Sequence, residues 1–216
     1  MKIAIAGPDG SGKSSVCKMI TENVEGSALI YAGKNRNHLL FTTTLALNLW
    51  KISRVKGKTG YLASLITRYL VFYPLEYFEN LSRFRAKRNS RLVIYDRHPI
   101  DRVILKYEFR LAKKQKDIRY FFEYVLMNFW SKIYLHFFPS VDKLFVLLPE
   151  PELCFRRARG QYKDIKSAVR KFEAYVTAIK AYRNTKQSVI PVYVKPGRSI
   201  QNICGEILRN IDYGKI

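Results

Sequence analysis

Acidic side chains are scarce in this sequence of 216 residues. Asp and Glu total 17 against 39 Lys and Arg, which gives a formal net charge of +22. The shortage is also local, since no Asp or Glu occurs between positions 26 and 75. A surface this basic attracts polyanions, so nucleotides, nucleic acid and anionic membranes are the candidate partners. The charge alone leaves all three open, and the motifs described below lead us to expect a small anionic molecule as the substrate.

Cysteine is also rare, and long apolar runs are absent. The three cysteines, at positions 17, 154 and 204, are odd in number and lack the spacing of a metal site. The apolar runs are shorter than the ~20 residues of a membrane-spanning helix. The first of them is too short for a secretory signal. We therefore expect a soluble, cytoplasmic protein.

Apolar residues nevertheless make up 48% of the chain, which excludes global disorder. No repeat or low-complexity linker divides it, so a single domain over 1–216 is expected. Five runs are predicted to be buried strands, and Pro191 favours a sheet edge for the last. The runs span 2–6, 28–32, 91–95, 143–148 and 188–194.

Helical patterns alternate with these runs, and Pro74 is expected to kink or break the helix that contains it. The predicted helices span 14–23, 39–55, 61–87, 119–138, 151–159, 165–185 and 199–211. Alternating strands and helices predict an α/β fold in which helices cover both faces of a parallel sheet. Ligand sites are then expected at the carboxyl ends of the strands.

Residues 7–14 read Gly-Pro-Asp-Gly-Ser-Gly-Lys-Ser and match the phosphate-binding pattern GxxxxGK[ST]. Glycine permits positive φ, so successive N–H groups can point at a phosphate, and the following helix adds its dipole. In this pattern Lys13 bridges the β- and γ-phosphates and Ser14 ligates Mg²⁺. The sequence therefore predicts a site for ATP and Mg²⁺. The residues expected to bind ATP are Gly7, Asp9, Gly10, Ser11, Gly12, Lys13, Ser14 and Ser15.

A second candidate site follows the third predicted strand, where Asp96, Arg97 and His98 come in succession. A carboxylate at this strand end suits Mg²⁺, directly or through water. Arg97 can bind two oxygens of an anionic acceptor at once. A structural ion pair between Asp96 and Arg97 is the alternative, His98 is expected only to pack, and Asp101 is a weaker candidate or a helix cap.

A third candidate is the helix that ends at Gly160, because Arg156 and Arg159 lie on one of its faces. Such a pair can neutralise charge on a phosphoryl group in transfer. The polar residues that follow favour a mobile lid over 156–170. Solvated surface arginines are the alternative. The residues expected to be catalytic are Lys13, Asp96, Arg97, Arg156 and Arg159.

In order and spacing, these three elements resemble the thymidylate kinase family of P-loop kinases. The resemblance implies a three-layer P-loop NTPase fold with a five-stranded parallel sheet, in which residues 34–90 form a helical acceptor-binding insert. It implies that Asp9 contacts the sugar hydroxyl of the acceptor and that Arg97 holds its phosphate, while Ser14 and Asp96 hold magnesium. The family is usually dimeric, so a homodimer is expected.

Two departures from the family leave the acceptor open. The segment after the second strand reads Lys-Asn-Arg-Asn-His over 34–38, where the family has an acidic segment, and the Phe and Arg that read thymine are not evident around Pro74. The basic side chains, Arg36 among them, suit a nucleoside monophosphate, whose ionised phosphate needs no general base. A hydroxyl acceptor on a nucleoside or sugar, as in surface-polysaccharide synthesis, would need a carboxylate base. Asp9, Asp96 and Asp101 are the candidates for that base.

The aromatic stretch from Tyr120 to Phe138 supports a competing class, a nucleotide-binding protein at an anionic membrane surface. Such stripes more often belong to a core or a dimer interface, so weak membrane contact remains the alternative. No nucleic-acid-binding motif occurs, and no specific nucleic-acid partner is expected. The sequence thus predicts an ATP- and Mg²⁺-dependent kinase, with a nucleoside monophosphate as the favoured acceptor.

Overall fold

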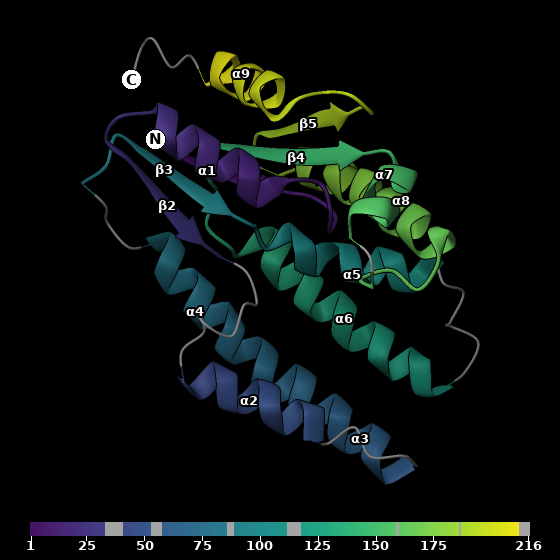
Figure 1. The fold of residues 1–216 in the computed structure, drawn as a ribbon. Coiled ribbons are helices and arrows are strands. Elements are labelled where there is room, and N and C mark those ends of the chain that lie inside the picture. The colour runs from purple at the N-terminus through teal and green to yellow at the C-terminus, as the bar shows by residue number, and fades with distance from the viewer. Residues whose placement is uncertain are drawn as a thin grey trace.

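Five parallel strands form a sheet in the order β2-β3-β1-β4-β5 (Figure 1). The computed structural model describes residues 1–32, 41–52, 58–85, 89–111, 118–158, 160–185 and 187–211. All five predicted strands are confirmed, and Pro191 lies in the edge strand β5, where a residue without an N–H is tolerated. The strands are β1 (Lys2–Ala6), β2 (Ser27–Tyr31), β3 (Leu92–Asp96), β4 (Lys143–Pro149) and β5 (Val189–Val194).

Helices cover both faces of the sheet, because alternate side chains of the central strand point to opposite sides. Ile3 and Ile5 of β1 enter one core with α1 (Lys13–Asn23) and α9 (Ile200–Asn210). Ala4 and Ala6 enter the other core. That second core includes α5 (Ile100–Leu111), α6 (Ile118–His136) and α8 (Ile165–Arg183). The three-layer α/β architecture expected from the alternating pattern is confirmed.

Helix α5 lies outside the predicted helices, although its sequence carries a helical signal. Ile100, Val103 and Ile104 recur at helical spacing and are fully or almost fully buried. Pro99 precedes the helix, and Asp101 lies in its first turn, where a carboxylate interacts well with the helix dipole. This helix matters for function because it carries Asp101 and Arg102.

The helix predicted over 61–87 is interrupted before Pro74, as expected. It divides into α3 (Lys58–Ile66), a π-helix (Thr67–Phe72) and α4 (Tyr73–Arg85). The N–H of Tyr73 bonds to the carbonyl oxygen of Arg68, five residues earlier. Proline has no N–H and crowds the carbonyl one turn before it, which explains the wider turn at this place. Together with α2 (Phe41–Ile52), these helices extend below the sheet in Figure 1.

The aromatic stretch of α6 divides between the protein interior and its surface. Trp130 and Tyr134 are buried, and the Trp130 indole N–H donates to the carbonyl oxygen of Tyr69 at 2.9 Å. Phe121, Phe122 and Phe129 are exposed by 56%, 59% and 56%. These three side chains form what we call the outer aromatic face of α6, which is not core within the single chain.

Within the described ranges, no helix is both long enough and apolar enough to cross a membrane.

Candidate functional site

The phosphate loop joins β1 to α1 at the carboxyl edge of the sheet. Gly7, Gly10 and Gly12 have φ values of +145°, +81° and +87°, which side chains rarely adopt. A Cβ on Gly7 would lie 2.4 Å from the carbonyl oxygen of Leu147 in β4, and one on Gly10 would lie 3.0 Å from that of Cys154. The loop therefore packs against the backbone of two other elements, and this packing determines its shape.

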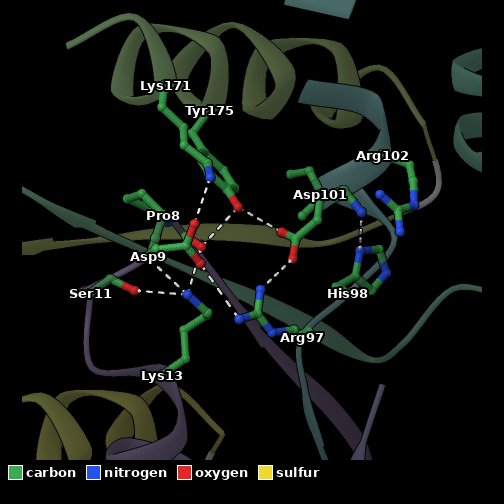
Figure 2. Close-up of polar contacts among 12 residues, drawn as sticks. Pro8, Asp9, Ser11, Lys13, Arg97, His98, Asp101, Arg102, Lys171 and Tyr175 are labelled. Atoms are coloured by element: carbon green, nitrogen blue, oxygen red, sulfur yellow. Dashed lines mark hydrogen bonds and ion pairs between the residues drawn. The ribbon is translucent and has the colours of Figure 1, made fainter. Parts of the chain in front are cut away.

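Lys13 is held inside the curve of this loop. Its ammonium donates to the carbonyl oxygens of Gly7 and Pro8 at 2.8 and 2.7 Å, and the residue is only 5% exposed (Figure 2). Burial lowers the pKa of Lys13, although nearby carboxylates, Asp101 first among them, oppose that shift. A phosphate that replaced the two carbonyl contacts would give this buried cation a charged partner.

Ser14 and Asp96 fit a magnesium ion. Asp96 ends β3 and is buried, and its Oδ1 has no hydrogen-bond partner among the described residues. Ser14 is exposed in the first turn of α1. A carboxylate and a hydroxyl are oxygen ligands of the kind that Mg²⁺ prefers, usually together with phosphate oxygens. These two residues would hold the ion, which when bound would neutralise charge on the phosphates.

Arg97 has a strained backbone that turns its side chain toward the phosphate loop. Its φ is +83°, which places it alone among the described non-glycine residues in the left-handed region, at a cost of roughly 1–3 kcal/mol. The guanidinium lies 3.5 Å from both Asp9 and Asp101. The alternative of an Asp96–Arg97 ion pair is therefore wrong for the described chain. The buried Nε has no partner within it, so the side chain keeps hydrogen-bonding capacity for a ligand.

Asp9 and Asp101 each have partners for both carboxylate oxygens. Lys171 donates to Asp9 Oδ2 at 2.7 Å, and the Tyr175 hydroxyl lies 2.7 Å from Asp101 Oδ1 and 2.8 Å from the carbonyl oxygen of Gly7 (Figure 2). The remaining oxygen of each faces Arg97. Burial by itself would raise the pKa of Asp9, but the charges of Lys171, Lys13 and Arg97 outweigh it and leave that pKa below its usual value. Burial raises the pKa of Asp101 even beside Arg97.

A cavity of about 430 Å³ opens beside these residues, at the ends of β2 and β3 and between α4, α5 and α8. Its wall includes a buried ion pair: Arg102 Nε donates to Glu76 Oε2 at 2.7 Å, and a second guanidinium nitrogen contacts Oε1. Burial raises the pKa of Glu76 and lowers that of Arg102 to about 10. Asn80 lies one turn after Glu76. The cavity therefore has a polar wall on the side of α4 and α5.

The connection between α7 (Pro151–Arg157) and α8 is shorter than the lid expected over 156–170. Helix α8 begins at Ile165, because Asp164 caps it by accepting from the N–H of Ser167 at 2.7 Å. The Tyr162 hydroxyl donates to the carbonyl oxygen of Asp9 at 3.0 Å, so Tyr162 lies against the phosphate loop. The segment 156–170, which was expected to be a lid, thus includes the first residues of α8.

The structure brings together most of the predicted site residues. The phosphate loop, Asp96 and Arg97 meet at one edge of the sheet. Arg156 is exposed in the last turn of α7 and makes no polar contact with them within the described ranges. Arg36 and Arg159 lie outside the described residues.

Several residues of the site were not predicted as site residues, among them Glu76, Asn80, Arg102 and Lys171. Two signals were available for them. Glu76 is the first acid after the acid-free stretch, and Lys171 lies one turn before Tyr175 on the same helix face.

Comparison with known proteins finds structural neighbours. No family model matches the chain, and no curated protein does. Among solved structures, a thymidylate kinase from Candida albicans superimposes with a TM-score of 0.67 and 18% identity, over 99% of this chain and 92% of that one. A deoxyadenosine kinase from M. mycoides, with the products dCMP and a flexible dCDP bound, superimposes with a TM-score of 0.59 and 14% identity, over 99% of both chains. The chain has the fold of these kinases. The fold expected from the resemblance is thereby confirmed.

The contact between Gly7 and β4 can be tested with Gly7→Ala. The added methyl group would meet the Leu147 carbonyl oxygen and deform the loop, and such overpacking costs about 1–3 kcal/mol. We expect the affinity for Mg²⁺–ATP, measured by calorimetry, to fall about tenfold or more. Gly205→Ala in α9, where a Cβ meets nothing within 4 Å, is the matched control and should bind like the original protein. Equal affinities for the two variants would contradict the assigned role of the loop.

Proposed function

We propose that this protein is an ATP- and Mg²⁺-dependent kinase that transfers the γ-phosphoryl group to the phosphate of a nucleoside monophosphate. The observation that carries the proposal is the placement of Arg97. Its guanidinium faces the cavity from a position beside the phosphate loop, and its Nε lacks a partner in the described chain. An acceptor phosphate bound there would lie next to the triphosphate. The fold shared with a thymidylate kinase supports this reading.

The state of the carboxylates in the cavity favours a phosphate acceptor over a hydroxyl acceptor. Asp9 is paired with Lys171 and Arg97, Asp101 with Arg97 and Tyr175, and Glu76 with Arg102. A hydroxyl acceptor needs a carboxylate that is free to accept its proton. A phosphate monoester is already largely ionised near neutral pH, since its second pKa is about 6. Positioning and charge neutralisation then suffice for the transfer.

In the proposed reaction, the bond between the γ-phosphorus and the oxygen it shares with the β-phosphate breaks. A bond from that phosphorus to an acceptor phosphate oxygen forms, and ADP leaves. Lys13 would neutralise charge on the β- and γ-phosphates, and Arg97 would orient the acceptor. Lys171 adds positive charge where the two substrates meet, because it borders the cavity beside Asp9. The protein would act through positions and charges that exist before the substrates bind.

A kinase of nucleoside or sugar hydroxyl groups is the second candidate. The likeness to a deoxyadenosine kinase favours it, as does the position of Asp9 and Asp101 in the wall of the cavity. A screen of ATP consumption with nucleoside monophosphates, nucleosides and sugars separates the two candidates. Turnover of a monophosphate supports the first proposal, whereas turnover of unphosphorylated acceptors alone would replace it with the second.

For the assembly, we propose a homodimer that covers the outer aromatic face of α6. Exposed Phe side chains clustered on one helix face are typical of interaction surfaces. Weak binding to an anionic membrane is the alternative for the same face. Light scattering should show a mass near twice 25.3 kDa. A monomer that floats with anionic vesicles would favour the membrane instead.

The role of Lys13 can be tested with Lys13→Ala. Its ammonium is the buried cation inside the loop, and loss of one such electrostatic contact typically lowers kcat ~100-fold or more. Lys18→Ala on the exposed side of the same helix is the control, because Lys18 pairs with Glu22 at the surface. We expect steady-state assays to show that Lys13→Ala loses nearly all of its turnover and that Lys18→Ala keeps the turnover of the original protein. Normal turnover by Lys13→Ala would refute the phosphoryl-transfer role.

The role of Arg97 can be tested with Arg97→Gly, which removes the guanidinium and also relieves the strain at φ +83°. A lost charge-assisted hydrogen bond is worth ~1.5–3 kcal/mol, so the KM of the acceptor should rise ~10- to 100-fold. The KM of ATP should change far less. A thermal midpoint that does not fall would show that the effect is local. If both KM values rose equally, Arg97 would not be an acceptor residue.

A further inference from the structure

A second cavity, of about 350 Å³, lies near the ends of α6 and α8, on the face of the sheet that these helices cover. We call it the distal cavity; His98, Tyr134, Phe138, Ser140 and Tyr182 line it. Both helices end just before a strand begins, so their ends lie at the amino edge of the parallel sheet. The phosphate loop lies at the opposite edge. Among the residues that line the two cavities, His98 is the one they share.

His98 presents a hydrogen-bond donor without a partner. Its Nδ1 accepts the N–H of Ile100 at 3.1 Å. A ring nitrogen that accepts a hydrogen bond carries no proton, so the ring proton is on Nε2, which is a donor. The residue is 3% exposed, and none of the described residues accepts a hydrogen bond from Nε2. A buried donor left in this state is costly unless a ligand or water satisfies it.

Tyr182 adds a second buried polar group to the same cavity. It is 3% exposed, and its hydroxyl also has no hydrogen-bond partner in the described part of the chain. Its ring lies 5.8 Å from that of His98 between centroids, at an interplanar angle of 69°. Unsatisfied groups from the segment after β3 and from α8 thus lie in the wall of one cavity. Their position points to a ligand that hydrogen-bonds with both.

The remaining wall indicates the chemistry of that ligand. Tyr134 and Phe138 add aromatic surface, with Phe138 lying 6.2 Å from His98 between ring centroids. Uncharged polar side chains complete much of the wall, among them Asn184, Thr185 and Gln187. No Asp, Glu, Lys or Arg is among the described residues that line the cavity. A charged ligand would lose its hydration there without gaining an ionic partner. The volume is near the lower end of the roughly 300–1,000 Å³ of small-molecule sites.

We propose that the distal cavity binds an uncharged planar heterocycle of nucleobase size. A ring carbonyl or ring nitrogen accepts the proton of His98 Nε2, and a second polar atom bonds to the Tyr182 hydroxyl. The flat faces of such a ligand pack against the aromatic side chains, which favour offset or edge contacts. The site is distinct from the acceptor cavity and does not depend on the proposed kinase reaction.

Calorimetry with uracil, thymine and adenine tests the proposal on the full chain. At least one of these probes should bind, and Tyr182→Phe should weaken that binding about tenfold because one hydrogen bond is lost. Tyr193→Phe, at an exposed tyrosine outside the cavity, is the matched control and should have no effect. Absence of binding at millimolar concentrations of all three probes would overturn the proposal.

Two further variants show which of the two cavities binds the probe. They also keep the test valid if Tyr182→Phe does not fold. Ser140→Trp places a bulky ring at an exposed position of the distal wall and should abolish binding, whereas Asn80→Ala in the acceptor cavity should leave it unchanged. The reverse pattern would place the probe in the acceptor cavity and overturn the proposal. A crystal grown with the probe should show it within hydrogen-bonding distance of both His98 Nε2 and the Tyr182 hydroxyl. Ordered water alone at that place would also overturn it.

Discussion

Charges that are buried or partly buried near the phosphate loop have to be paired, and this constraint organises the carboxyl edge of the sheet. Lys13, Arg97 and Lys171 supply positive charge, and Asp9 and Asp101 oppose it. The carboxylates and the carbonyl oxygens of the loop are the partners of these cations in the structure. A buried cation is tolerable only with such partners. The same cations are therefore already in position before a phosphate group binds to them.

This arrangement needs the packing of several elements at once. The loop keeps its shape because Gly7 and Gly10 press against the backbone of β4 and α7. Arg97 keeps its strained conformation while its N–H donates to the carbonyl oxygen of Ile5 in β1 at 2.9 Å. Strain of this kind persists where the surrounding structure holds it, and it is frequent at functional sites. The site is consequently a property of the sheet edge and its three adjoining strands.

The two cavities differ in charge, and this difference separates their ligands. The acceptor cavity contains ion pairs and cations, including the Glu76–Arg102 pair, and suits an anionic molecule that also forms hydrogen bonds. The distal cavity has aromatic side chains in its wall, and the polar groups of His98 and Tyr182 there have no hydrogen-bond partner within the described residues. His98 borders both, directly after Arg97 in the chain. One short segment after β3 thus contributes to each.

Local sequence patterns determined the strands, the phosphate loop and the interruption at Pro74. Each of these depends on residues near one another in the chain: apolar runs, glycines in a loop, and the missing N–H of a proline. For the same reason Lys13, Ser14, Asp96 and Arg97 could be named in advance as candidates.

Only the tertiary structure decided which distant side chains join them. Lys171 meets Asp9 across 162 positions, and Arg102 meets Glu76 across 26. It also decided that Arg97 pairs with Asp9 and Asp101 instead of Asp96, and that His98 lies between two cavities. Such contacts depend on how helices pack on the sheet and on backbone angles at single residues, which a periodic pattern of apolar residues does not encode.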